Sequence, residues 1–349
     1  MQGWALLLAQ PFLYLPDTLT HAINLMTEKE ILARRIEELT GWKLNIARLK
    51  IVTDTSDWMR INRGDVLRVG GQDYVIKGNM REPRFGIDDQ PKLWVFSAIS
   101  MADGSEKIIK TVYDEEFYAH IGFLKIRCYR SQDKESAVME ACRNDARFMQ
   151  GITAYDDENN NVRIIDYIRG KTFFHYLPDI KKKHEEYFHE DLGDILHNLK
   201  HSIEGIRFLH KNGLCHGDIR NDHIIIEQDS RLYRWIDFDL NQDVNDFDLW
   251  SLGNILSYAV AKGILTFTHV LKSPDFSNHV KQSLTAEDCS AFYEYRIMNL
   301  KKVYSYIPPK LSKLLNHFTI KPIAYYTGID EFISDYEEML DSEFPAIRS

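Results

Sequence analysis

Apolar residues recur at helical spacing through residues 192–210. The repeating positions are Leu192, Ile195, Leu196, Leu199, Ile203, Ile206 and Leu209. Spacings of three and four residues place these side chains on one face, so the pattern predicts a buried helix. The β-branched run 224–226 and the segment 232–236 are each typical of a short strand. The pattern therefore predicts a helix, a loop, and two strands joined by a turn.

The first half of the chain is patterned mainly as strands. The predicted elements are strands over 66–77, 93–96 and 123–129 and a helix over 131–142. The glycine-containing segment 78–86 is predicted to be the turn between the first two strands. Thr27 and Glu30 form a capping-box pattern for an earlier helix that ends before Gly41.

Composition and charge narrow the class of protein. The chain has 349 residues, of which 44% are apolar and 27% charged. These values are ordinary for a folded globular protein, and the length is enough for one two-lobed unit. The formal net charge of −9 argues against a nucleic-acid-binding function, because neutralising phosphates requires a basic surface.

The cysteines and the first apolar segment bear on location. The four cysteines are far apart and form no C-x-x-C pair, which favours reduced thiols in a cytoplasmic protein over a disulfide framework or a zinc site. The apolar stretch 4–15 contains Gln10 and Pro11 and is shorter than the roughly 20 residues of a spanning helix. The first three residues lack the basic start of a signal peptide. We expect no membrane span.

Charged residues cluster in the loop and turn that follow the helix over 192–210. The loop reads His216-Gly217-Asp218-Ile219-Arg220-Asn221-Asp222-His223, and the second strand leads into Asp237-Phe238-Asp239. Asp248-Leu249-Trp250-Ser251-Leu252-Gly253 then opens an apolar helix. This order of parts resembles the catalytic half of a protein kinase, whose loop pattern is H-R-D-L-x-x-x-N and whose metal-binding turn is D-F-G.

The resemblance implies a role for each of these residues. Phosphoryl transfer needs one carboxylate to orient the attacking hydroxyl, a second to hold Mg²⁺, and cations to orient the donor. By resemblance, Asp218 orients the hydroxyl, Asp237 binds the metal, and Arg220 lies beside the transferred phosphoryl group. His223 stands in place of the metal-binding asparagine and Asp239 in place of the glycine, and both are candidate metal ligands. Imidazole suits softer metals than Mg²⁺, so Mn²⁺ is an alternative cofactor.

The same resemblance assigns a lysine and a glutamate in the first half of the chain. Residues 106–112 resemble the third strand of the small kinase lobe, which puts Lys110 at the position that contacts the α- and β-phosphates of ATP. Lys107 is the alternative, although alternation sends it to the other side of the strand. On the helix that follows, Glu135 is the candidate partner that positions the lysine, and Glu140 is its alternative.

Two further segments are expected to hold the nucleotide. The candidate phosphate-contacting residues, in a segment that resembles the glycine-rich loop, are Gly78, Arg84, Phe85 and Gly86. Pro83 stands where a middle glycine is expected and removes one backbone donor. Residues 162–170 resemble the last strand of the small lobe and the linker beyond it. There, backbone groups near Asp166 and Ile168 would hold the adenine ring, and Ile165 would close the back of the pocket.

The implied fold is α+β and bilobal. Its expected parts are an N-terminal extension over 1–63 that caps the first lobe, a small β-rich lobe over 64–168, and a larger, mostly helical lobe over 169–349. Asp248 is expected to brace the loop that carries Asp218 by accepting hydrogen bonds from its backbone N–H groups.

The segment after the metal-binding turn departs from the protein kinase pattern. Only residues 240–247 separate Asp239 from Asp248, and no A-P-E sequence is present, so the usual long activation segment is missing. This short form also resembles aminoglycoside and choline phosphotransferases, which act on small molecules.

The expected function is that of an ATP- and Mg²⁺-dependent phosphotransferase acting on a hydroxyl acceptor, with protein Ser or Thr as the first choice. One alternative is a pseudokinase that binds a nucleotide or a partner protein without turnover, which His223, Asp239 and Pro83 favour. A second alternative is a small-molecule kinase of the aminoglycoside phosphotransferase type.

Overall fold

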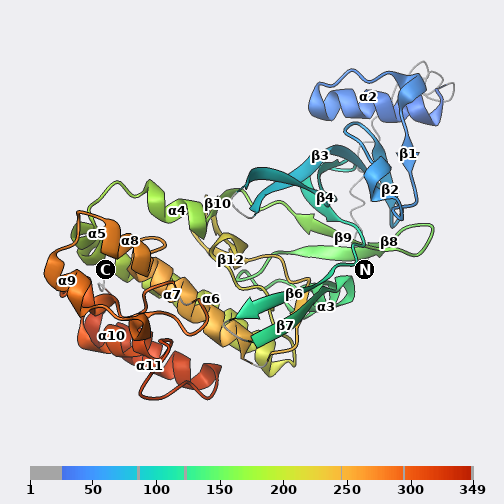
Figure 1. The fold of residues 1–349 in the computed structure, drawn as a ribbon. Helices are drawn as coiled ribbons and strands as arrows, with labels where there is room; N and C mark the ends of the chain where they lie inside the picture. The colour runs from blue at the N-terminus through green and yellow to red at the C-terminus, as the bar shows by residue number, and fades with distance from the viewer. Residues whose placement is uncertain (1–25, 85–86, 122–123, 245, 294, 347–349) are drawn as a thin grey trace, which may run out of the picture.

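A β-rich lobe and a helical lobe make up the chain (Figure 1). The computed structural model describes residues 26–84, 87–121, 124–244, 246–293 and 295–346. The large sheet of the β-rich lobe contains β1 (Ile51–Val52), β2 (Val66–Val69), β3 (Gln72–Arg84), β4 (Ile87–Ser100), β5 (Glu106–Lys110), β8 (Gly151–Tyr155) and β9 (Asn161–Asp166). Their order is β1-β2-β3-β4-β5-β9-β8, and every neighbouring pair except β1 and β2 is antiparallel. The predicted bilobal α+β fold is confirmed.

A helix near the N-terminus covers one face of this sheet. The helix α2 (Glu28–Thr40) begins with the predicted capping box between Thr27 and Glu30 and ends at Gly41, whose φ of 72° is the left-handed conformation that glycine tolerates. The side chains that α2 buries against β2, β3 and β4 include Leu32, Ala33 and Ile36. Two short 3₁₀ turns, η1 (Ile46–Arg48) and η2 (Trp58–Arg60), connect it to the sheet. That residues 1–63 form a separate cap on the first lobe stays a prediction.

The hairpin of β3 and β4 is longer than the sequence pattern predicted. The prediction of a turn over 78–86 is wrong, because β3 continues through Gly78 to Arg84. Three register shifts between the strands allow this, and Gly78 lies at one of them with a φ of 148°. Pro83 falls within another, where a missing N–H breaks no regular ladder. Phe85 and Gly86 lie outside the described residues.

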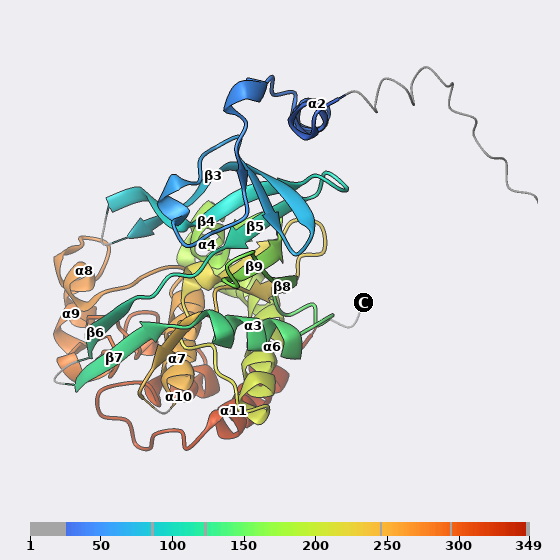
Figure 2. The same cartoon turned by 90° about the vertical axis from the view of Figure 1, so that its right-hand side faces the viewer.

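A second hairpin precedes the helix of the β-rich lobe. Its strands are β6 (Glu116–Ile121) and β7 (Leu124–Arg130), and α3 (Gln132–Ala141) follows with Ser131 as its N-cap. The short strand β13 (Leu240–Gln242) pairs with β7, giving the sheet β13-β7-β6 that runs beside the helical lobe (Figure 2). The predicted strand over 123–129 and helix over 131–142 are confirmed within a residue.

The helical lobe is built around two long helices. Its helices are α4 (Phe173–Asp179), α5 (His184–Glu190), α6 (Leu192–Lys211), α7 (Phe247–Val260), α8 (Phe267–Lys272), α9 (Asn278–Ser283), α10 (Pro309–Asn316) and α11 (Ile329–Glu343), with 3₁₀ turns η3 (Asn221–His223), η4 (Ala286–Asp288) and η5 (Leu300–Lys302). The strands β10 (Gly170–Thr172), β11 (Ile224–Glu227) and β12 (Tyr233–Trp235) form a small antiparallel sheet.

All seven apolar positions predicted for one face of α6 are buried in the main core. Trp235 of β12 is fully buried beneath α6 and donates its indole N–H to the Ser202 carbonyl at 2.8 Å. This contact fixes the strand that leads into Asp237. Among the described residues, no helix combines the length and apolar character needed to cross a bilayer. The segment 4–15 lies outside the described part of the chain.

A glycine-to-alanine pair tests the packing of α7. A Cβ added at Gly253 would overlap the ring of Phe318, whereas one added at Gly193 in α6 would lie 3.6 Å from Phe344 Cδ1, an ordinary contact. Alanine normally stabilises a helix by up to about 1 kcal/mol relative to glycine. We expect Gly253→Ala to lower the free energy of unfolding by about 1–3 kcal/mol through overpacking, and Gly193→Ala to leave it unchanged or raised. Urea denaturation measures both, and equal effects would contradict the packing described.

Candidate active site

The loop after α6 is held from below by a buried aspartate at the start of α7. Asp248 accepts hydrogen bonds from the backbone N–H groups of His216 and Gly217, both at 2.8 Å, and lies 2.9 Å from His210 Nε2. Burial alone would raise the pKa of Asp248, but the hydrogen bonds from His210 and Gly217 outweigh it and lower the pKa. The predicted bracing role of Asp248 is confirmed.

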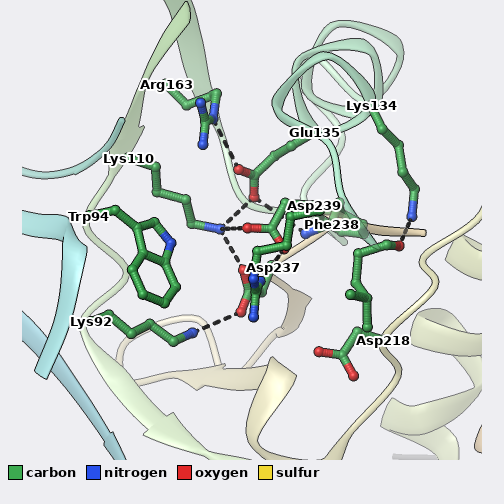
Figure 3. A network of polar contacts seen from close by, with 12 residues as sticks. Lys92, Trp94, Lys110, Lys134, Glu135, Arg163, Asp218, Asp237, Phe238 and Asp239 are labelled. Carbon is green, nitrogen blue, oxygen red and sulfur yellow. Dashed lines mark hydrogen bonds and ion pairs between the residues drawn. The ribbon is translucent and has the colours of Figure 1, made fainter. Parts of the chain in front are cut away.

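The loop also lies close to the segment that follows the metal-binding turn. Gly217 has a φ of 82°, and a Cβ there would collide with the Leu240 carbonyl oxygen. Lys134 of α3 reaches the same place, where its Nζ donates to the carbonyl oxygens of Leu240 and, at 2.8 Å, of His216 (Figure 3). A single lysine thus connects α3, the loop and β13.

Asp218 lies in this loop with its side chain mostly, but not fully, buried. Its backbone N–H donates to His216 Nδ1 at 3.3 Å, and its side chain is 19% exposed. Burial of the carboxylate raises the pKa of Asp218. A carboxyl group with a raised pKa is a better hydrogen-bond acceptor and base, which suits a group that orients an attacking hydroxyl.

A buried ion-pair network joins β5, α3 and the turn after β12. Lys110 Nζ lies 2.6 Å from Glu135 Oε1 and 2.5 Å from Asp237 Oδ1, and the lysine is only 6% exposed (Figure 3). Burial would lower the pKa of Lys110, but Asp237 and Glu135 raise it, so the lysine carries its charge. Arg163 of β9 holds the other oxygen of Glu135 at 3.3 Å. The structure therefore brings together three residues that are far apart in the sequence.

The alternatives for the lysine and the glutamate point elsewhere. Lys107 binds Asp166 at 2.6 Å at the surface, and Glu140 pairs with Arg143 in solvent. Glu135, in contrast, is fully buried on the face of α3 that meets the sheet.

Asp237 is held in an unusual backbone conformation by the residues around it. Its φ is 69°, which is rare for a residue with a side chain and is found where the surroundings compensate for strain. The next residue, Phe238, is fully buried against His216 and Phe148, and its N–H lies 3.3 Å from Glu135 Oε1. Burial would raise the pKa of Asp237, but Lys110 and Lys92 lower it well below its usual range.

His223 faces Asp237 in a defined tautomer. Its Nδ1 lies 2.7 Å from the Asp218 carbonyl oxygen, which can only accept, so Nδ1 carries a proton. In the neutral ring Nε2 then has a lone pair, and this atom lies 3.4 Å from Asp237 Oδ2. A histidine that donates its second N–H to a carbonyl is the arrangement found in metal-ligating histidines.

Asp239 lies between two cations of the same network. Its Oδ1 accepts from Arg130 Nη1 at 2.6 Å, and its Oδ2 lies 4.0 Å from Lys110 Nζ (Figure 3). Arg130 also binds Glu115 at 2.7 Å. The described residues contain no group of three or more His, Cys, Asp or Glu side chains arranged to hold a metal ion.

A cavity between the lobes adjoins this network. Its volume is about 270 Å³, and its apolar lining consists of Met80, Val95, Ile108, Met149, Ile165, Ile168, Ile225 and Ile236. Lys92, Lys110, Asp222, His223 and Asp237 line its polar end. An apolar slot that ends in charged groups fits a flat heterocycle with a charged tail.

The residues expected to hold a nucleotide are only partly brought to this cavity. Ile165, Asp166 and Ile168 line it. The Asp166 N–H already donates to the Gln150 carbonyl at 2.8 Å, which leaves the carbonyl of Asp166 and the backbone of Ile168 for an adenine edge. Gly78 lies outside the lining, within β3.

Arg220 forms an ion pair with Asp222 of the same loop. Its Nε lies 2.9 Å from Asp222 Oδ1, within a bidentate pair. In this structure Arg220 is therefore oriented by Asp222, a residue that lines the cavity and that sequence reasoning passed over.

Sequence reasoning also missed Lys92, Arg130 and Arg163. Arg163 lies within the continuous buried run of β9, so a charge inside an apolar strand was the available signal. Lys92 and Arg130 had no comparable signal, because their positions depend on a bulge and on a strand pairing that the pattern does not encode.

Comparisons with known proteins give limited matches. No family model matches the chain. Over 93 residues, or 26% of its length, the chain is 32% identical to "Probable serine/threonine-protein kinase fnkE" of Dictyostelium discoideum, and the match spans 7% of that protein. Among solved structures, a point mutant of the PknI kinase domain of Mycobacterium tuberculosis is similar with a TM-score of 0.47 and 12% identity, over 80% of this chain and 98% of that one.

The described part of the chain has the bilobal α+β arrangement that the resemblance to protein kinases implied. A β-rich lobe carries Lys110 and the helix with Glu135, a helical lobe carries the loop with Asp218 and the turn with Asp237, and a cavity lies between them. These are the parts that the resemblance implied, in the order that it implied.

The brace at Asp248 provides a test of how the loop is held. Asp248→Asn replaces one acceptor oxygen with an amide that must face a backbone N–H, so one buried donor loses its partner. We expect the free energy of unfolding to fall by about 1–3 kcal/mol in urea denaturation. The exposed Asp229→Asn is the matched control and should change it by less than about 0.5 kcal/mol. Equal stability of the two variants would contradict the bracing role.

Proposed function

We propose that this protein is an ATP-dependent phosphotransferase that moves the γ-phosphoryl group to a hydroxyl acceptor, with Ser or Thr of a protein as the expected acceptor. The observation that carries the proposal is the buried contact of Lys110 with Glu135 and Asp237 at the polar end of the cavity. A buried lysine in contact with two carboxylates costs considerable desolvation, and such clusters mark functional sites more often than structural ones.

In this proposal each charged residue has one task. Asp218 accepts the hydrogen bond of the attacking hydroxyl, whose oxygen forms a bond to the γ-phosphorus as the bond to the bridging β,γ-oxygen breaks. The hydroxyl proton passes to Asp218 or to an oxygen of the transferred phosphoryl group, and ADP leaves with the electron pair of the broken bond. Lys110 holds the donor phosphates, and Glu135 holds Lys110.

The donor groups at the polar end fit a divalent cation in part. Asp237 offers a carboxylate oxygen and His223 offers Nε2, so the remaining ligands must come from phosphate oxygens and water. When bound, the metal neutralises charge on the phosphates. Arg220, two residues after Asp218, would also neutralise charge on the phosphates once its ion pair with Asp222 opens.

The role of Asp218 predicts a loss of turnover without a loss of binding. Asp218→Asn should reduce transfer of label from γ-³²P-labelled ATP by about 100-fold or more, because the amide cannot take the hydroxyl proton. ATP binding, followed as a rise in melting temperature, should be unchanged. The exposed Asp157→Asn serves as the control with full activity. Turnover equal to wild type in Asp218→Asn would overturn the assignment.

A pseudokinase is the second candidate, and one observation favours it. Asp237 is already held by Lys110 and by Lys92, and Asp239 by Arg130, so two carboxylates at the site have cationic partners without any metal. A protein of this kind would bind ATP without a divalent cation and would not turn it over. Stabilisation by ATP in excess EDTA, together with no label transfer, would favour this candidate.

His223 predicts an altered metal preference. Because imidazole is a better ligand for Mn²⁺ than for Mg²⁺, Mn²⁺ should support ATP-dependent stabilisation at several-fold lower metal concentration than Mg²⁺ in the wild type. His223→Asn supplies an amide oxygen in place of the imidazole nitrogen. It should reduce or reverse this ratio between the Mn²⁺ and Mg²⁺ concentrations that are needed for stabilisation. Thermal shift titrations with each metal measure it, with EDTA as the blank. The same ratio in both variants would exclude His223 as a ligand.

The nature of the acceptor rests on the short segment 240–247. Its first residues are paired with β7 as β13, so they are not available as the extended platform on which a peptide acceptor usually lies. This pairing supports the small-molecule acceptor as the alternative. Protein Ser or Thr stays the first choice, because the chain matches over 93 residues a curated protein named as a serine/threonine-protein kinase. Labelled ATP offered with a generic protein substrate and with a panel of amino sugars and amino alcohols separates the two.

The free thiols of the four cysteines support the reducing, cytoplasmic setting that the proposal assumes.

A further inference from the structure

A second lysine reaches the polar end of the cavity from β4, the strand that pairs with the strand of Lys110. Lys92 of β4 places its Nζ 3.1 Å from Asp237 Oδ2, across 145 residues of sequence, and its side chain is 14% exposed (Figure 3). Asp237 therefore lies between two ammonium groups, one on each carboxylate oxygen. Neither the sequence pattern nor the resemblance assigns a role to Lys92.

A bulge in the long hairpin is what directs Lys92 inward. Asn79 pairs with Phe96 in the ladder, but the next residue, Met80, pairs with Lys92, so three residues of β4 have no partner on β3. Such bulges bend a strand and redirect side chains, and they are common next to active sites.

The bulge is fixed to the strand that carries Lys110. The Trp94 carbonyl accepts from the Thr111 N–H at 3.0 Å, and the Trp94 ring stacks on Tyr113 at a centroid separation of 3.7 Å. Asn79 Nδ2 donates to the Leu93 carbonyl at 3.0 Å from the other strand. Because these contacts tie the bulge to the end of β5, Lys92 and Lys110 are positioned together.

We propose that Lys92 binds the phosphate groups of the donor nucleotide together with Lys110, and that Asp237 keeps both ammonium groups in place until the nucleotide binds. The inference rests on the proposed function. The ligand class is a nucleoside di- or triphosphate, recognised by its phosphates.

The opposite role for Lys92 is an electrostatic lock that competes with the nucleotide for Asp237. The two roles predict changes of opposite sign. If Lys92 binds phosphate, its removal weakens ATP binding; if it locks Asp237, its removal strengthens binding of ATP with metal. Adenosine lacks phosphates, so its affinity should not change when Lys92 is removed in either case.

Calorimetric titration of the full chain with adenosine, AMP, ADP and ATP tests the inference. For Lys92→Met we expect the dissociation constant for ATP to rise by roughly tenfold or more, because one charge-assisted hydrogen bond is lost. The affinity for adenosine should be unchanged. Lys92→Arg should retain most of the ATP affinity. Lys77→Met, which removes a lysine paired with Glu106 on the same sheet, is the matched control and should bind ATP as wild type.

The outcomes distinguish this inference from the proposed function. Unchanged or tighter ATP binding in Lys92→Met overturns the role of Lys92 and leaves the proposed function standing. A wild-type protein that binds none of the four ligands overturns both. Adenosine binding shows that each variant is folded, and Lys92→Gln, which retains a polar group for Asp237, replaces Lys92→Met if the latter does not fold.

Discussion

The buried contact of Lys110 with Glu135 and Asp237 is the interaction on which the active-site half of the structure depends. It joins strand β5, helix α3 and the turn after β12, which come from three separate parts of the chain. Taking three charges out of water is costly, and removing any one of them would leave the others buried without compensation. Arg163 and the Phe238 N–H complete the partners of Glu135, so the network is satisfied on the side facing the core. The side facing the cavity, where Asp237 meets Lys92, is the side that a ligand can change.

The hairpin β6–β7 holds the segment that follows the metal-binding turn. It pairs with β13 directly after Asp239, and Arg130 at its end binds both Asp239 and Glu115. Lys134, one turn into the next helix, binds the carbonyl oxygens of Leu240 and His216. The segment after the metal-binding turn is therefore held by strand pairing and by two cations of the chain itself.

Much of the fold and part of the site followed from the sequence, for physical reasons that differ between regions. The helix over 192–210 was predictable because a buried helix must repeat its apolar residues at its own period. Lys110 and Glu135 were predictable because the resemblance places a lysine on a particular strand and a glutamate on the helix that follows. The β3–β4 hairpin was mispredicted because glycine and proline were taken as turn signals, whereas register shifts absorb both. Lys92 could not be found, since its direction is set by a bulge whose contacts are all tertiary.

The exchange of partners at Asp237 links the two ligands that the site is proposed to bind. Both lysines now contact Asp237, and His223 presents Nε2 to the same carboxylate. Phosphate oxygens that take over the lysines would release Asp237 toward a cation, and a cation on Asp237 and His223 would in turn weaken its hold on the lysines. Each ligand then favours the other, and linkage requires that the effect be equal in both directions. By this proposal nucleotide and metal bind as a unit, because the phosphates take over the lysines and the cation takes over the carboxylate that the lysines leave.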